Sequence, residues 1–178
     1  YSGSFLFTAF SGRIDQAMKL ISYSDIQADI NPQTLKNGSI CAALSEPSIE
    51  FLLRNGELYQ AKHGDVVFEY GKEGDGFFIV CQGCLDFYKV HNNVCRHNRE
   101  IDFGEEIGFL SMIALRERTG NAIAQKDTIL LKVPAELFSK LHQEYPFDFG
   151  IMTLNLARDM ARVLHKISND LVDVSLKI

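Results

Sequence analysis

The chain has 178 residues, 46% of them hydrophobic and 23% charged, which is the size and composition of one compact domain that buries its own core. Its net charge of −5 argues against nucleic acid as a direct partner, because nucleic-acid-binding proteins usually concentrate Lys and Arg on one face. No apolar run approaches the roughly 20 residues that cross a bilayer, and Phe5–Phe7 is too short for the hydrophobic region of a signal peptide. We therefore expect a cytoplasmic protein without a membrane partner.

The N-terminal part of the sequence is predicted to be an arm followed by helices. Residues 1–12 show no clean periodicity, whereas apolar residues recur at helical spacing from 14 to 30, a stretch that ends before Pro32. A second helix is expected over 48–55. We assign residues 1–47 to an N-terminal arm and helical segment.

From Glu57 to Val133 the pattern changes to short apolar runs punctuated by glycine, which is typical of a barrel or sandwich of short strands. The predicted strands are 66–68, 77–80, 85–90, 121–124 and 128–133. Consecutive antiparallel strands are expected between Gly64 and Leu85, with positive φ at Gly71 and Gly74 in the turn that separates them. His91 to Asn93 is expected to form a hairpin turn.

The C-terminal part of the sequence returns to a helical pattern. Pro134 is placed to open a short helix, and residues 147–178 read as one long helix. An apolar seam runs along the long helix at steps of three or four: Met160, Val163, Ile167, Leu171, Val174 and Ile178. The seam predicts a homodimer built on this helix, and the alternative is that it packs on the chain's own strands.

Among the four cysteines, only Cys81 and Cys84 have a spacing that suits a metal or a redox disulfide. A four-coordinate metal would need two more ligands, and the nearby His91 and His97 lie in a polar hairpin stretch. We therefore expect no metal, and we interpret the two cysteines as strand residues that flank a glycine.

The glycine and apolar spacing resembles that of the cyclic nucleotide-binding domain, in particular the sensing domain of the catabolite activator (Crp-Fnr) superfamily. The residues that carry the resemblance are Gly64 to Phe68, Gly71, Gly74, Asp75, Phe77 to Val80, Gly83 and Leu85. It covers about residues 48–171 and implies a mainly β fold with flanking helices: a jelly-roll-like double-stranded β-helix, or β-roll, over 48–146 and a dimerisation helix over 147–178. The helix-turn-helix domain of the transcription regulators in that superfamily is not part of this sequence.

A second resemblance concerns residues 103–124, which are similar to that family's phosphate-binding cassette and are called the cassette below. It implies that Gly104 and Glu105 open a short helix, that Arg118 binds a cyclic phosphate and that Glu105 or Glu106 accepts from the ribose 2′-hydroxyl. On the long helix, Ile167 and Ser168 correspond to residues that touch the base. The implied binding residues are Gly104, Glu105, Glu106, Ile107, Gly108, Phe109, Arg118, Thr119, Ile167 and Ser168.

The length of the cassette leaves alternatives open. Typical cAMP-binding members place the glutamate closer to the arginine than the 12 positions that separate Glu106 from Arg118. Arg118 would otherwise be a surface arginine at the start of a strand, or part of a salt-bridged scaffold. The expected function is therefore a regulatory, non-catalytic domain that senses cAMP or cGMP without any further cofactor, and the alternative is a dimeric interaction scaffold without nucleotide.

Overall fold

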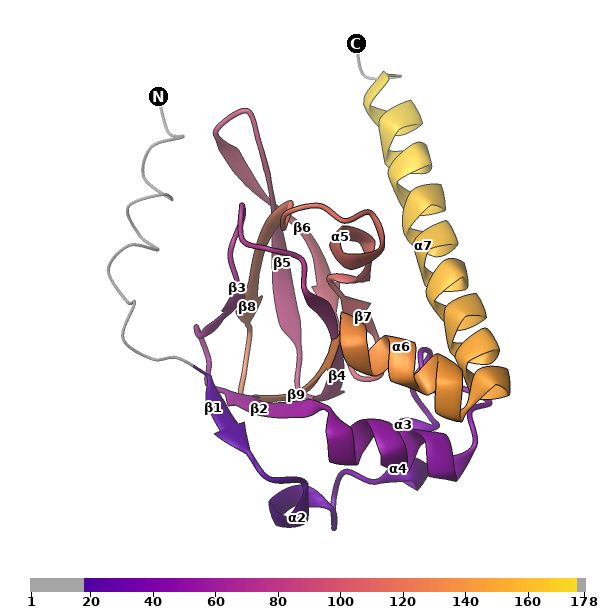
Figure 1. Ribbon diagram of the computed structural model, residues 1–178. Helices are drawn as coiled ribbons and strands as arrows, with labels where there is room; N and C mark the ends of the chain where they lie inside the picture. The colour runs from indigo at the N-terminus through magenta and orange to yellow at the C-terminus, as the bar shows by residue number, and fades with distance from the viewer. Residues whose placement is uncertain (1–17, 176–178) are drawn as a thin grey trace.

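The structure, a computed structural model, describes residues 18–175 (Figure 1). Two β-sheets form a roll: a five-stranded sheet of order β1-β2-β9-β4-β7 and a four-stranded sheet of order β3-β8-β5-β6. The strands are β1 (Lys19–Ile21), β2 (Glu57–Ala61), β3 (Val66–Phe68), β4 (Gly76–Gln82), β5 (Leu85–His91), β6 (Val94–Ile101), β7 (Glu106–Ile107), β8 (Gly120–Ala124) and β9 (Thr128–Pro134). The helices are α2 (Tyr23–Ile26), α3 (Pro32–Leu35), α4 (Glu46–Asn55), α5 (Phe109–Ile113), α6 (Ala135–Glu144) and α7 (Pro146–Ser175).

This arrangement confirms the predicted fold class, with one correction to how the strands pair. No helix interrupts residues 64–85, as expected, but β3 and β4 do not pair with each other. Strand β3 pairs with β8, whereas β4 pairs with β9 and β7 in the other sheet. The chain therefore crosses from one sheet to the other at the glycine turns. Each sheet buries one face against the other, and Phe78 of β4 and Leu85 of β5 lie in the core between them.

The two turn glycines act differently from each other. Gly71 has a φ of +80°, as predicted, but Gly74 is not among the residues of positive φ. A Cβ atom on Gly74 would lie 2.6 Å from the Arg116 carbonyl oxygen and 2.9 Å from the Ser111 Cβ atom. Gly74 is therefore needed for the close approach of the cassette to this turn and not for its backbone conformation.

The predicted helix over 14–30 is wrong for its described part. Lys19–Ile21 forms strand β1, which pairs antiparallel with β2, and only Tyr23–Ile26 is helical. Residues 1–17, including the predicted arm, lie outside the described residues. The reason for the correction is tertiary: the open edge of β2 offers backbone hydrogen bonds to this segment, which outweigh a weak local helix preference.

Two further elements differ from expectation in ways that have a local cause. Helix α4 is confirmed but begins at Glu46, because the Ser45 hydroxyl caps it by accepting a hydrogen bond from the Ser48 N–H at 3.4 Å. Strand β6 was not predicted, since its central residues 96–100 are all polar. It lies at the edge of its sheet, where both faces of a strand are largely exposed, and it follows the predicted hairpin turn at Asn92 and Asn93, which both have positive φ.

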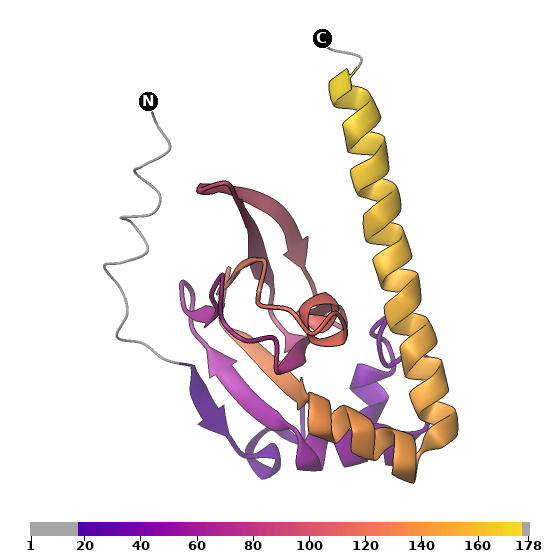
Figure 2. The same ribbon diagram turned by 45° about the horizontal axis from the view of Figure 1, so that its top comes forward.

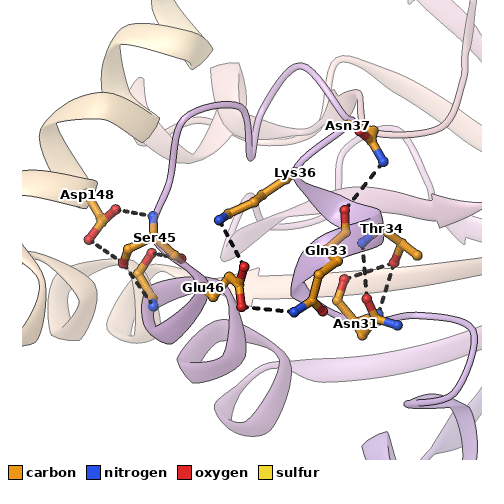
Figure 3. Close-up of polar contacts among 9 residues, drawn as sticks. Asn31, Gln33, Thr34, Lys36, Asn37, Ser45, Glu46 and Asp148 are labelled. Carbon is orange, nitrogen blue, oxygen red and sulfur yellow. Dashed lines mark hydrogen bonds and ion pairs between the residues drawn. The ribbon is translucent and has the colours of Figure 1, made fainter.

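The first half of α7 is fixed to the helices beside the roll by polar contacts (Figure 3). The Asp148 carboxylate accepts hydrogen bonds from the Ser45 N–H at 2.6 Å and from the Ser45 hydroxyl at 2.9 Å. Further along the helix, the Asn155 amide donates to the carbonyl oxygens of Ile40 and Ala42 at 3.1 and 2.8 Å. The same half buries Met152 and Leu156 in the core between the helices and the five-stranded sheet.

The second half of α7 continues past the roll and beside α5 (Figures 1 and 2). The seam there is exposed in the single chain, with Ile167, Leu171 and Val174 at 50, 69 and 58% exposure. Ile178, the last residue of the predicted seam, lies outside the described residues. Within residues 18–175, no helix combines the length and the apolar character that spanning a membrane requires.

Candidate functional site

A cavity of about 510 Å³ lies between the cassette, the four-stranded sheet and α7. From the cassette it is lined by Glu106, Ile107, Gly108, Leu110, Ser111 and Thr119, and from α7 by Asp159, Met160, Val163, Leu164 and Ile167. Its walls also include the aromatic rings of Phe68 and Phe87 and the basic side chains of Lys89 and Arg99. Pockets of about 300–1,000 Å³ with mostly apolar walls and a few convergent polar groups are typical of small-molecule sites.

The cassette reaches the cavity through a short strand and not through a helix that opens at Gly104 and Glu105. Glu106 and Ile107 form β7 and pair with β4, so the expected early helix start is wrong. The helix α5 begins at Phe109, after Gly108, which has a φ of +100°. The open edge of β4 holds the first part of the cassette extended, which places the Glu106 side chain in the cavity wall.

The two candidate glutamates are placed differently. Glu106 lines the cavity at 5% exposure, and its Oε2 accepts a hydrogen bond from the Phe109 N–H at 3.0 Å. Glu105 does not line the cavity, and its Oε2 instead accepts from the Asp102 N–H at 2.9 Å. Burial raises the pKa of Glu106 to about 7; the Phe109 N–H and Arg99 oppose this rise, and Asp159 adds to it.

Arg118 lies behind the cavity wall. Its side chain is 2% exposed, so the surface interpretation is wrong. Nη1 donates to the Gly108 carbonyl oxygen at 2.9 Å, Nη2 donates to the Gly76 carbonyl oxygen at 2.7 Å, and Nη2 lies 3.5 Å from Asp75 Oδ1. The guanidinium also stacks 4.6 Å from the centre of the Phe68 ring. Burial lowers the pKa of Arg118, and the Asp75 carboxylate opposes that change.

The other predicted residues divide between the cavity and its surroundings. Ile107, Gly108, Thr119 and Ile167 line it, whereas Gly104, Phe109 and Ser168 do not. The Phe109 ring packs edge-on against Phe77 in the core, and its N–H is engaged by Glu106. Ser168 is exposed on α7.

Sequence reasoning missed Asp159. This residue lines the cavity at 4% exposure; its Oδ1 lies 3.8 Å from Arg162 Nη1, and its Oδ2 has no hydrogen-bond partner among residues 18–175. The signal that could have found it is its spacing from Met152 and Leu156, which places Asp159 on the buried face of α7. A charged residue on the apolar face of a helix is unusual, because Asp is rarely buried without a partner.

The cysteines lie away from this cavity. Cys81 and Cys84 are both buried beside the turn between β4 and β5, and burial raises the pKa of Cys84 to about 11. Across the part of the chain that the structure describes, the group of His, Cys, Asp and Glu side chains close enough to share a metal ion is Cys84 with Glu100 and Asp102. Neither histidine considered from the sequence belongs to it.

Comparison with known proteins points to one family. Residues 59–145 match the model of the family described as "Cyclic nucleotide-binding domain". The fold is similar to the crystal structure of Thermus thermophilus Catabolite Activator Protein, with a TM-score of 0.66 and 24% sequence identity over 78% of this chain and 63% of that one.

Two curated relatives are also similar in sequence. One is "Lysophospholipase NTE1" of Pyricularia oryzae, 31% identical over 123 residues, which are 68% of this chain and 8% of that protein. The other is the "cAMP-dependent protein kinase regulatory subunit" of Debaryomyces hansenii, 29% identical over 110 residues, which are 61% of this chain and 23% of that protein. The chain thus spans only a small part of the length of these relatives.

Proposed function

Because residues 59–145 belong to the cyclic nucleotide-binding domain family, we propose that this chain is a regulatory domain that binds a cyclic nucleotide, cAMP or cGMP, in the cavity between the cassette and α7. One observation carries the proposal. A single cavity joins Glu106, Gly108 and Thr119 of the cassette with Ile167 of α7, although these residues are far apart in the sequence. They are the residues that the resemblance implies should touch one ligand.

Each wall of the cavity would supply a different part of the recognition. The Glu106 carboxylate is placed to accept a hydrogen bond from the ribose 2′-hydroxyl, while the apolar side chains of Val163 and Ile167 cover the base. Arg118 would bind the phosphate by exchanging the Gly108 carbonyl oxygen for a phosphate oxygen. Ligand binding would then be coupled to a movement of the cassette, and the domain would act through a shift in population between two states.

A second candidate function is a dimeric scaffold that binds no nucleotide, and a specific observation favours it. Donors of two residues that the resemblance names are already engaged inside the chain: Nη1 and Nη2 of Arg118 by the carbonyl oxygens of Gly108 and Gly76, and the Phe109 N–H by Glu106, while Arg118 Nε has no partner among residues 18–175. In either function we propose that α7 pairs with a second copy through its exposed seam, because isolated domains rarely expose an apolar stripe of this length. We propose no catalytic role for the domain, and a cytoplasmic location remains a prediction.

Titration with ligands separates the two candidates. Calorimetry and thermal unfolding should be measured with cAMP, cGMP and linear 5′-AMP as the control ligand. A ligand that binds only the native state at 100 times its dissociation constant stabilises the protein by about 2.7 kcal/mol, which raises the melting temperature. If neither cyclic nucleotide binds at millimolar concentration, the sensing proposal fails and the scaffold takes its place.

Variants in the two walls then locate the ligand. Val163→Trp fills the cavity from α7 and should abolish binding, whereas Lys166→Trp, on an exposed position of the same helix, should not. Arg118→Ala should weaken binding by about 10- to 150-fold, since a charge-assisted bidentate contact is lost, while Arg116→Ala on the exposed turn should leave it unchanged. Equal affinity in the wild type and Arg118→Ala would exclude Arg118 from the site.

A further inference from the structure

Asp159 brings a carboxylate oxygen into the cavity that the rest of the protein does not use. The residue is 4% exposed, lines the cavity, and follows Leu156 and Met152 on the buried face of α7. Its Oδ1 lies 3.8 Å from Nη1 of Arg162, whose own side chain is largely exposed. Its Oδ2 is buried and accepts no hydrogen bond from any residue in the described part of the chain. Buried acceptors are almost always paired in folded proteins, so this oxygen calls for an explanation.

The charged side chains near Asp159 do not supply a hydrogen bond to its Oδ2. Glu106 lines the same cavity and is also a carboxyl group, so it repels Asp159, and the Asp159 charge is one of the causes that raise the pKa of Glu106. Arg99 lines the cavity too, but its Nη2 donates to the backbone oxygen of Glu106 at 3.1 Å. Lys89 lies in the cavity wall without a hydrogen bond to Asp159. The protein places two acidic side chains around one apolar cavity and supplies a donor to only one of them.

A carboxylate can only accept hydrogen bonds, so the missing partner must be a group that carries an N–H or O–H. We propose that Asp159 Oδ2 accepts a hydrogen bond from a donor of the bound nucleotide, which makes Asp159 a binding residue of α7 in addition to its apolar side chains. This inference rests on the proposed function. An ionised cyclic phosphate carries no donor, so the donor is an N–H of the base or the 2′-hydroxyl, whose single hydrogen would then go to Asp159 and not to Glu106.

The position of Asp159 gives this contact a consequence beyond affinity. The residue is on α7, whereas Glu106 and Arg118 belong to the roll and the cassette. A ligand held by both walls ties the helix to the cassette across the cavity. Occupancy of the cavity is thereby coupled to the position of the exposed half of α7.

The test uses the intact chain, an isosteric variant and nucleotides that lack one donor each. Asp159→Leu removes the acceptor, and Asp170→Leu removes a carboxylate from an exposed position of the same helix that does not line the cavity. Calorimetry should be run with cAMP, cGMP, 2′-deoxy-cAMP and the cyclic phosphate of unsubstituted purine riboside. We expect Asp159→Leu to weaken binding of the preferred nucleotide by about 10- to 100-fold, and Asp170→Leu to change it by less than about 2-fold.

The analogues identify the source of the donor. If the sugar donates, 2′-deoxy-cAMP binds the wild type and Asp159→Leu equally. If the base donates, the unsubstituted purine analogue binds the wild type and Asp159→Leu equally. A loss of the same size with every nucleotide would overturn the proposal, since it would show a general change in the cavity, and so would unchanged affinity in Asp159→Leu.

Failure of the proposed function gives a different result. If the wild type binds no cyclic nucleotide, both proposals fall; if the wild type binds and Asp159→Leu binds equally well, only the contact at Asp159 falls. Folding is checked by thermal unfolding without ligand, where Asp159→Leu should match or exceed the wild type because it removes an unpaired buried carboxylate. Should the leucine variant fail to fold, Asp159→Ala, which also removes the acceptor and adds no bulk to the cavity, gives the same comparison.

Discussion

The two walls of the cavity are built differently. On the cassette wall, Nη1 and Nη2 of Arg118 link Gly108 to Gly76 and Glu106 accepts from Phe109, while the buried Arg118 Nε has no hydrogen-bond partner among residues 18–175. The α7 wall is held at its root, by Asp148, by the Asn155 amide and by packing around Leu156. Further along the helix, Asp159 Oδ2 has no partner among the described residues and the seam is exposed.

This difference shows that one wall is preorganised and the other is incomplete in the single chain. On the cassette wall a bound phosphate would replace only the Arg118–Gly108 hydrogen bond, whereas α7, with its unpaired acceptor and uncovered apolar face, would gain new contacts along its exposed half. We therefore expect α7 to be the element whose position changes most when a ligand enters the cavity. Four variants test this contrast, taken in order of their expected effect on the free energy of unfolding.

The largest effect is expected from breaking the cassette wall. Arg118→Ala removes the donors to the Gly76 and Gly108 carbonyl oxygens and leaves Asp75 paired with Lys132 alone, which should lower the free energy of unfolding by about 3–5 kcal/mol. Urea denaturation at neutral pH measures it. Arg116→Ala, two positions earlier and exposed, should cost less than about 0.5 kcal/mol. Equal stability of the two variants would show that the cassette wall does not depend on this cross-link.

The next effect concerns the root of α7. Asp148→Ala removes two hydrogen bonds to Ser45, one from its N–H and one from its hydroxyl, and should cost about 2–3 kcal/mol. Asp170→Ala, exposed on the same helix, serves as the control. Amide hydrogen exchange should show faster opening of α7 in Asp148→Ala than in the wild type. Unchanged exchange would mean that the Asn155 hydrogen bonds and apolar packing hold the helix without Asp148.

A third prediction concerns Glu106 and pH. The pKa of Glu106 rises from its ordinary value of 4.5 to about 7 in the folded protein. As pH increases between these values the unfolded state releases a proton that the folded state retains, so stability falls and the penalty is complete above the folded pKa. Glu106→Gln removes this titration and keeps an acceptor for the Phe109 N–H. The variant should therefore be more stable than the wild type by about 1–3 kcal/mol at pH 8 and should show little advantage at pH 4.

Urea denaturation across that pH range checks the prediction about Glu106. Glu105→Gln, whose carboxylate lies outside the cavity, is the matched control and should follow the wild type. A gain of the same size at both ends of the pH range would contradict the assigned cause, because it could not come from a proton.

The smallest effect on folding is expected at the outer half of α7. Leu171 is 69% exposed in the single chain, so Leu171→Asp should change the free energy of unfolding of the protomer by less than about 0.5 kcal/mol. If α7 pairs with a second copy, the same change should weaken dimerisation by about 100-fold or more, since a charge would enter an apolar interface. Sedimentation velocity at several concentrations measures this, with Lys166→Asp as the control. A wild type that remains a monomer at high concentration would show that the seam has another partner.

Much of the fold could be predicted from the sequence because its determinants are local. Gly71 and Gly83 supply the positive φ that the turns require, and Asn92 and Asn93 do the same for the hairpin. Helix α4 begins with Pro47 in its first turn after the Ser45 cap, and α6 begins directly after Pro134, which occupies the N-cap position. These signals depend on residues that are neighbours in the chain, so they can be read without the tertiary structure.

The remaining features were decided by contacts between distant segments. Lys19–Ile21 became a strand because β2, far from it in the sequence, has an open edge. The place of Arg118 behind Gly108 depends on the approach of β4 to the cassette, which no spacing records. The sequence by itself determined a set of short strands, their turns and a long amphipathic helix, because period and backbone preference are properties of consecutive residues, and the β-roll was implied by the family resemblance. Only the tertiary structure decided that Asp159 and Glu106 line one cavity, because their relative position is set by how two separate elements pack.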